Sequence, residues 1–374
     1  MMKVGFYTSQ REYEEKMAEF NEAMINSIKN GVKTLGEDVI AFEKEVQDFA
    51  KVKHAIGVAS GTDALVIASD ILGYKDEKEI ITSPFTFLAS TSCIARHRGK
   101  PVFVDIDEET FNIDTRKIEE KITKNTVGVL PIHLFCQMAN MDDIMDIAKR
   151  YNLSVLEDAA EAFGMQWKGN GDTYRHAGTI GDMGIYSFFP TKTLGAYGDG
   201  GLIVTNNDEL ADITKMYRVH GAKKKYNHEY MGYNSRLDNI QAAILRVKLK
   251  YINEALEKRN QIHDLYVERL KDISEITLPK IKGDQIPVYY VFNITCHKRD
   301  ELNQYLNEQG IGTSIYYPTP LHLQKCFSYL GYKKGDFPIA ERVSERILAL
   351  PIYPELTIQE IDYVCEKIRE FYRK

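Results

Sequence analysis

Between residues 55 and 160 the chain alternates short β-rich runs with stretches of helical length, and this alternation limits the folds open to it. Strands separated by helices of this length are typical of βαβ units, in which helices cover a buried sheet of parallel strands. We therefore predict an α/β fold with a mostly parallel sheet. The expected strands are 55–59, 79–82, 101–105, 127–131 and 153–156, and the expected helices are 63–72, 90–98, 115–122 and 140–151.

A different pattern begins after Leu237. Apolar residues from Ile240 to Leu256 recur at helical spacing, which predicts a long helix that leaves the first domain. Single cores rarely grow beyond about 250–300 residues, so a chain of 374 residues should form two units. We expect a large α/β domain with an N-terminal helix at residues 1–250 and a smaller α+β domain at 251–374. Its expected elements are a strand at 288–295 and helices at 299–308, 339–348 and 357–372.

Charge and cysteine content argue against several classes of protein. The net charge is −6 and there is no long block of like charge, so we expect neither a nucleic-acid partner nor a membrane partner. The N-terminus lacks the apolar core of a signal peptide, and no uncharged run approaches the ~20 residues that span a bilayer. Five widely spread cysteines favour neither a disulfide framework nor a zinc site. We expect a cytoplasmic protein without a metal.

One lysine stands in an unusual context. Lys192 follows an apolar, strand-like run and precedes four glycines within residues 195–201. Most lysines are solvated surface charges, but glycines let the backbone approach a ligand closely. A partly desolvated site disfavours the charged amine, so we expect the pKa of Lys192 to fall. Its amine could then form a Schiff base with an aldehyde.

Three further groups follow the ends of other expected strands. Asp158 could pair with a protonated pyridine nitrogen, although Glu157 and Asp158 could equally cap a helix. Gly61 and Thr62 begin a helix whose free N–H groups could hold a phosphate, or they could form an ordinary N-cap. Phe87 could stack on a ring or belong to the core.

The combination of these groups is more specific than any one of them. In a doubly wound sheet, ligands bind beyond the carboxyl ends of the strands. An anion-binding turn, an aromatic ring, an acid and a lysine would all meet at that edge.

The chain resembles the DegT/StrS-type sugar aminotransferases, which are fold-type-I pyridoxal-phosphate (PLP) enzymes related in architecture to aspartate aminotransferase. The similarity extends over nearly the whole sequence, and its motifs follow in order. They lie at residues 35–36, 42–43, 60–62, 101–105, 157–160, 187–188, 192, 232–238, 241–243, 317–318 and 321–322.

The resemblance implies a role for each matching residue. Lys192 would be the Schiff-base lysine and proton shuttle, Asp158 the partner of the ring nitrogen, and Phe87 the stacking aromatic. The phosphate would be bound by Gly61, Thr62 and Ser187, and by Asn234 from the neighbouring subunit. The resemblance thus implies a homodimer in which each active site needs both chains.

Two positions depart from the family pattern. Glu161 stands near the cofactor where the family has glutamine, so it brings a charge to that position. After His133, Phe135 and Cys136 replace a common Tyr-Gly pair.

The substrate motifs are most similar to those of enzymes that aminate C3 of dTDP-3-keto-6-deoxyhexoses, with L-glutamate as the implied donor. The products would be dTDP-3-amino-3,6-dideoxyglucose or its galactose epimer. The C4-specific enzymes, which make perosamine-type sugars, are the nearest alternative. Candidate substrate-binding residues are Phe6, Tyr7, Arg236, Tyr316, Tyr317 and His322, which offer aromatic and hydrogen-bonding groups.

Other functions stay open. Some members of the family act as PLP-dependent dehydratases or as non-catalytic sensors, but these have lost or replaced the lysine that is present here at Lys192. A cysteine desulfurase of the same fold would need a mobile catalytic cysteine, and no cysteine is placed for that role. An aminotransferase is the favoured reading.

Overall fold

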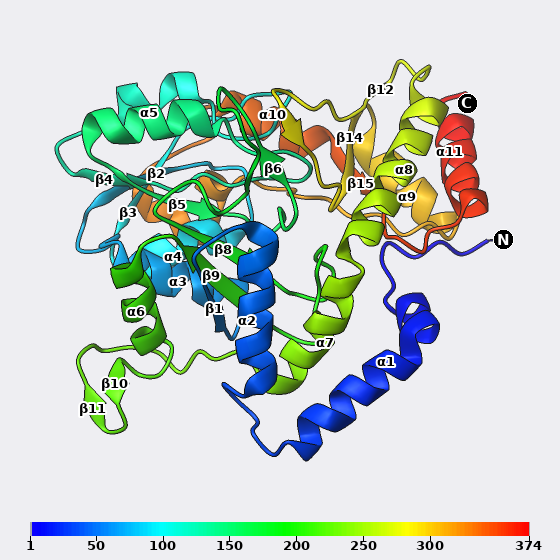
Figure 1. Ribbon diagram of the computed structural model, residues 1–374. Coiled ribbons are helices and arrows are strands. Elements are labelled where there is room, and N and C mark those ends of the chain that lie inside the picture. Colours follow the sequence, from blue (N-terminus) through cyan, green and yellow to red (C-terminus); the bar gives the residue numbers. More distant parts are fainter. Residues whose placement is uncertain (1, 374) are drawn as a thin grey trace.

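A seven-stranded sheet forms the centre of the larger part of the molecule, in the computed structural model that describes residues 2–373 (Figure 1). The strand next to the β1 edge runs antiparallel to both of its neighbours, and all other neighbouring pairs are parallel. The predicted mostly parallel sheet is thus confirmed. In spatial order the strands are β1 (His54–Val58), β9 (Gly201–Thr205), β8 (Met183–Ser187), β5 (Ser154–Asp158), β4 (Thr126–Val129), β2 (Glu79–Thr82) and β3 (Lys100–Phe103).

Helices cover both faces of this sheet (Figure 1). The side chains of β5 show why: Val155 belongs to the apolar cluster on one face and Leu156 to the cluster on the other. Alternation along a doubly buried strand produces this division. One cluster includes α2 (Glu37–Ala50), α5 (Met141–Tyr151) and α7 (Asn239–Lys250), and the other includes α3 (Gly61–Ile71), α4 (Leu88–Arg96) and α6 (Asp208–Tyr217).

The C-terminal part is built on an antiparallel sheet in the order β12 (Ile276–Thr277), β14 (Phe292–Cys296) and β15 (Ile347–Leu350). Phe292 and Ile294 face a cluster formed with α8 (Ile252–Leu270), α9 (Arg299–Glu308) and α11 (Ile358–Arg373). The N-terminal segment joins this part, because Val4 is buried in the same cluster and bridges to Ile311.

The remaining elements are peripheral or short. Helix α1 (Gln10–Lys29) lies against α7, and α10 (Pro338–Arg346) precedes β15. The minor strands are β6 (Gln166–Trp167), β7 (Arg175–His176), β10 (Ala222–Lys224), β11 (Asn227–His228) and β13 (Gln285–Ile286). No helix within residues 2–373 is long and apolar enough to cross a membrane.

Three expected elements differ in the structure. The helix expected at 115–122 is wrong: two 3-10 turns stand there, at Thr115–Lys117 and Glu119–Lys121, and the Asp114 carboxylate caps the first by accepting the Arg116 N–H. The helix expected at 339–348 ends at Arg346, and Ile347–Leu350 pairs with β14 instead. The long helix after Leu237 breaks at Tyr251 into α7 and α8. The domain boundary at residue 250 stays a prediction.

The end of β5 carries two buried carboxylates that point in opposite directions. Glu157 accepts backbone N–H groups of Gly178, Ile180 and Gly181 at 2.9, 2.6 and 2.6 Å, and it lies 2.8 Å from His133 Nε2. These bonds tie β5 to the turn before β8. The next residue, Asp158, therefore faces the other side of the strand at a fixed position.

Candidate active site

A cavity of about 580 Å³ opens at the carboxyl ends of β1, β2, β5 and β8. The chain turns that follow these strands supply most of its wall, as expected for a parallel sheet. The cavity brings together Gly61, Thr62, Phe87, Asp158, Glu161, Ser187, Lys192, Tyr316 and Tyr317, all of which were predicted site residues.

One end of the cavity is a cradle for an anion. Ser60 caps α3 by accepting the Asp63 N–H at 3.1 Å, and the next two residues, Gly61 and Thr62, line the cavity. Their N–H groups belong to the first turn, which has no partners inside the helix. A Cβ at Gly61 would lie 2.7 Å from Ser187 Cβ, so only glycine leaves room at this contact. The same helix start can therefore be capped by Ser60 and bind an anion through the N–H groups of Gly61 and Thr62.

A second wall of the cavity contains Asp158, a buried residue of which only 3% is exposed. Ser90 Oγ donates to its carboxylate at 2.7 Å and the Ala160 N–H donates at 3.1 Å. Burial raises the pKa of Asp158, while these two bonds and the charge of Lys192 act in the opposite direction. No helix follows β5, so the alternative of a helix cap is wrong. A cation in the cavity would stabilise this carboxylate further.

Lys192 and Glu161 form an ion pair in the lining of the cavity. The two side chains are 15% and 9% exposed, with Nζ 3.3 Å from Glu161 Oε1 and 4.3 Å from the centre of the Tyr290 ring. Burial disfavours the charged amine, but Glu161, followed by Tyr290 and Asp158, outweighs burial and raises the pKa of Lys192. The expected fall in this pKa is therefore wrong for the protein without a ligand, because the sequence placed the Glu161 charge near the site but not its direct contact with the amine.

The two departures from the family pattern meet at this point. The Phe135 N–H donates to Glu161 Oε2 at 3.1 Å, and the Phe135 ring stacks on Tyr317 with centroids 6.4 Å apart. Tyr317 OH in turn donates to Glu161 Oε1 at 3.4 Å. Glu161 is thus held by two donors in addition to Lys192.

Aromatic rings form the open side of the cavity. Phe87 is 58% exposed, so it is not an ordinary core residue, and its ring lies 6.3 Å from that of Tyr317. Phe6 does not line the cavity, but it packs edge-on against Tyr316, with ring centroids 6.0 Å apart. Flat, partly exposed rings of this kind suit a planar or sugar-like ligand.

Five predicted residues do not line the cavity: Phe6, described above, and Tyr7, Asn234, Arg236 and His322. Tyr7 donates to the Pro190 carbonyl at 2.5 Å, and burial raises the pKa of its hydroxyl to about 12. His322 is buried 3.0 Å from Glu341 Oε1, in a structural contact. Arg236 is half-buried and Asn234 is exposed, both on the segment before α7.

Sequence reasoning missed Ser90 and Tyr290. Ser90 lies in the first turn of α4, three residues after Phe87, so its place at the sheet edge could have been inferred. Tyr290 precedes β14, far along the chain, and no motif marked it. Of the five cysteines, none lines the cavity, and four are buried elsewhere.

Comparison with known proteins identifies the family to which this arrangement is similar. A family model for the DegT/DnrJ/EryC1/StrS aminotransferase family matches residues 14–369. A Geobacillus stearothermophilus protein named pleiotropic regulatory protein is 44% identical over 374 residues, covering 100% of this chain and 99% of the relative. An Aneurinibacillus thermoaerophilus dTDP-3-amino-3,6-dideoxy-alpha-D-galactopyranose transaminase is 39% identical, covering 94% and 95%.

The fold is also that of a solved structure. The X-ray structure of S. venezuelae DesV in complex with a ketimine intermediate superposes with a TM-score of 0.96 at 35% identity, with all of both chains covered. The predicted fold class is thereby confirmed.

The Lys192–Glu161 pair generates a testable prediction. Glu161→Gln removes the charge that raises the pKa of Lys192, so that pKa should fall and more of the amine should be neutral at a given pH. Because only the neutral amine attacks an aldehyde, ligand-free protein should capture added PLP at least ~10-fold faster at pH 8, the effect of about one pKa unit. Stopped-flow absorbance across pH measures this rate. Glu161→Asp keeps the charge and is the control, and superimposable profiles for Glu161→Gln and wild type would contradict the assignment.

Proposed function

The chain belongs to the DegT/DnrJ/EryC1/StrS aminotransferase family, and we propose that it transfers the amino group of L-glutamate to C3 of a dTDP-linked 3-keto-6-deoxyhexose. It is a PLP-dependent aminotransferase of nucleotide-linked sugars. The overall reaction converts glutamate and the keto sugar into 2-oxoglutarate and the 3-amino-3,6-dideoxyhexose. The observation that carries the proposal is the meeting of Lys192, Asp158 and the anion cradle of α3 in one cavity.

The cavity fits PLP at two separated points. The cradle formed by Gly61, Thr62 and Ser187 suits its phosphate, where a Cβ at Gly61 would fill the space. The buried Asp158 suits a protonated ring nitrogen. PLP supplies an aldehyde for covalent attachment and an electron sink for the reacting carbon.

The side chains of this chain divide the remaining work. With PLP bound, Asp158 would hold a proton on the ring nitrogen, and Ser90 keeps the carboxylate of Asp158 oriented. Lys192 Nζ would carry a proton between the carbon atom that loses the amino group and the carbon atom that gains it, a general acid–base role. Phe87 would hold the cofactor ring by stacking, and Tyr317 with Glu161 occupies the wall beside the lysine.

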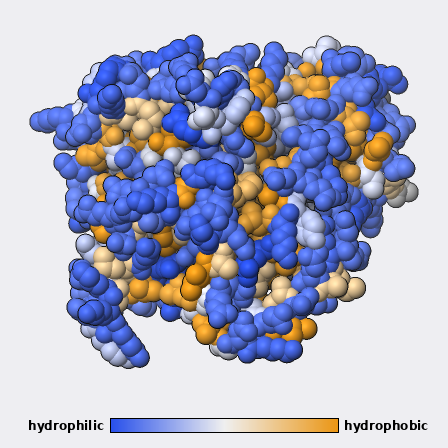
Figure 2. Space-filling model, viewed as in Figure 1, coloured by the Kyte–Doolittle hydropathy of each residue, from blue (hydrophilic) through white to orange (hydrophobic). Residues whose placement is uncertain are grey.

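We propose that the active form is a homodimer with shared sites. Asn234 lies outside the cavity of its own chain and is exposed, so it is available to a partner. Phe87, Leu88 and Phe189 near the mouth are 58%, 42% and 50% exposed, which suits burial by a second chain. Figure 2 shows further apolar side chains along the lower edge, where α1 and the turn into α2 lie in Figure 1.

Two observations support the substrate, and a third supports the compartment. The Aneurinibacillus relative is named for a 3-amino-3,6-dideoxyhexose, which favours C3 over the perosamine-type C4 alternative. The aromatic wall at Phe87, Tyr316 and Tyr317 suits the sugar and base of a nucleotide sugar. All five cysteines are unpaired, and we propose a reducing, cytoplasmic setting.

A regulatory role is the second candidate, because the Geobacillus relative is named a pleiotropic regulatory protein. A sensor would not need a lysine and an aspartate directed into one cavity. The presence of both Lys192 and Asp158 favours catalysis over sensing and over dehydration, which the family associates with loss of the lysine.

The first test separates catalysis from cofactor binding. Asp158→Asn should retain cofactor but lose transamination by at least ~10²-fold, because a neutral amide cannot hold the ring nitrogen protonated. Lys192→Ala should abolish the visible absorbance of the lysine-linked cofactor. Rates of glutamate-dependent amination and absorbance spectra measure the two effects. A full-strength band in Lys192→Ala would refute the central assignment, and a normal rate in Asp158→Asn would return that residue to a structural role.

The shared site is tested by mixing inactive chains. Lys192→Ala and Asn234→Ala each lack one contribution, so a heterodimer should contain one intact site and regain activity. Amination is assayed after subunit exchange, which is verified independently by mass spectrometry of differently tagged chains. If exchange is complete and no activity returns, Asn234 does not act across the dimer.

The choice of carbon is tested with matched 3-keto and 4-keto dTDP-6-deoxyhexoses. A pocket built for one pattern of hydroxyl and keto groups leaves buried polar groups unpaired with the other, so kcat/KM should favour the 3-keto sugar by at least ~10²-fold. The initial rates are measured with excess glutamate. Equal or better use of the 4-keto sugar would overturn the C3 assignment and leave the aminotransferase assignment in place.

A further inference from the structure

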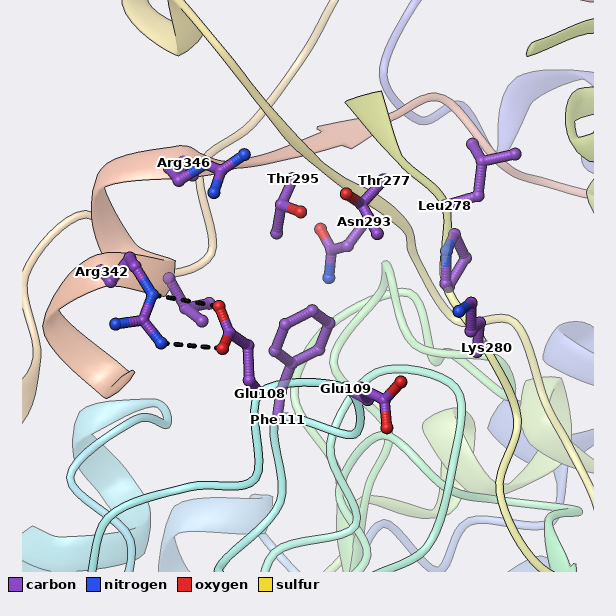
Figure 3. Close-up of a pocket in the computed structure, with 12 residues that line it drawn as sticks. Glu108, Glu109, Phe111, Thr277, Leu278, Lys280, Asn293, Thr295, Arg342 and Arg346 are labelled. Carbon is purple, nitrogen blue, oxygen red and sulfur yellow. Dashed lines mark hydrogen bonds and ion pairs between the residues drawn. The ribbon is translucent and has the colours of Figure 1, made fainter. Parts of the chain in front are cut away.

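A second cavity, of about 240 Å³, lies apart from the active site (Figure 3). Its walls come from the loop after β3, from β12 and β14, and from α10. It shares no lining residue with the cavity that contains Lys192. The two parts of the protein therefore meet around a separate hollow.

The face of the small sheet that borders this hollow is polar. Alternation along β14 turns Phe292 and Ile294 into the apolar cluster and turns Asn293 and Thr295 to the opposite side. Thr277 of β12 pairs directly with Thr295 and lies on the same face. A sheet face covered by another layer is ordinarily apolar, so this polar set is unusual.

The Asn293 side chain has no hydrogen-bond partner within residues 2–373. Its side chain is directed into the cavity, on the side of Phe111 (Figure 3), and the residue is only 3% exposed. Neither Oδ1 nor Nδ2 forms a hydrogen bond with any residue of the described chain. Buried amide groups normally have partners, so this side chain offers one acceptor and one donor to a molecule in the cavity.

The charges around the cavity leave cations available. Glu108 is committed to Arg342, with oxygens 3.0 and 2.7 Å from Nε and Nη2 (Figure 3), and Glu109 is committed to Lys282. Arg346 Nε is buried without a partner among the described residues, and its Nη2 has only His297 Nε2 at 3.4 Å. No carboxylate of residues 2–373 forms an ion pair with Arg346 or with Lys280.

We propose that this cavity is a binding site for a small carboxylate that also carries a hydrogen-bond donor, in the size class of a free amino acid. The carboxylate would accept from Arg346, and the donor would bind Asn293 Oδ1 while Asn293 Nδ2 donates to a ligand oxygen. Ligand pockets for drug-sized molecules occupy about 300–1,000 Å³, so this smaller space does not suit a nucleotide sugar. The proposal for this cavity does not rest on the aminotransferase reaction proposed above.

The test is a thermal-shift titration of the holoenzyme with L-glutamine, L-glutamate, L-asparagine and L-aspartate, with acetate as an anion that has no donor. At least one amino acid should raise the melting temperature by about 2 °C or more at a concentration near 100 times its Kd, and acetate should not. Because glutamate also enters the active site, the same shift should persist in Lys192→Ala, where the amine of the other cavity is removed.

Two variants assign the shift to this cavity. Asn293→Leu replaces the unpaired amide with an apolar group of similar size, so the protein should fold with an unchanged or higher melting temperature and lose the ligand shift. Arg346→Gln, at the half-buried edge, should weaken binding at least ~10-fold and tests the proposal even if Asn293→Leu folds poorly. Glutamate turnover should keep its KM in both variants.

Three results would overturn the proposal. The first is the absence of a shift with every amino acid of the panel. The second is a shift that persists in both Asn293→Leu and Arg346→Gln. The third is an equal shift with acetate, which would reduce the cavity to a general anion site without a role for Asn293.

Discussion

The active site depends on how β5 ends. This strand is covered on both faces, so its last two side chains, Glu157 and Asp158, cannot reach solvent, and alternation sends them in opposite directions. A buried carboxylate is costly unless hydrogen bonds or charges stabilise it. Glu157 receives three backbone N–H groups and contacts His133, whereas Asp158 receives two donors and faces a cavity. Glu157 therefore fixes the end of the strand, and Asp158 remains available to a ligand in the cavity.

The sequence predicted the parts of the fold that follow from periodicity, and it failed where tertiary pairing decides. The strands and helices between residues 55 and 160 appear with shifts of a few residues, except at 115–122, where two short 3-10 turns replace the expected helix. The apolar run 347–350 has no helical or strand signature of its own, and only its pairing with β14 makes it a strand. Such pairing joins segments about fifty residues apart, which local patterns do not record.

The same limit applies to the site. Strand ends brought Gly61, Phe87, Asp158 and Ser187 together as predicted, because the sheet itself collects them. The pKa of Lys192 was predicted in the wrong direction, since its sign depends on the position of Glu161 and not on burial alone. The buried carboxylate of Glu161 requires hydrogen-bond donors, and the Phe135 N–H and the Tyr317 OH are two of them. The two unusual residues form one local arrangement.

The active cavity and the second cavity are connected by one short segment. Tyr290 lies beside Lys192, and Asn293 follows three residues later in β14. The buried Arg259 of α8 donates to the carbonyls of Tyr289 and Tyr290 at 3.1 and 3.3 Å, which anchors this segment to α8. A ligand held by Asn293 and Arg346 would contact the same rigid strand that positions the ring beside the lysine. Any effect of that ligand on cofactor or substrate binding must then be reciprocal, because the coupling free energy between two sites is a single quantity. The strength of the coupling depends on whether Tyr290 moves relative to Asn293, and the Arg259 contacts oppose such movement.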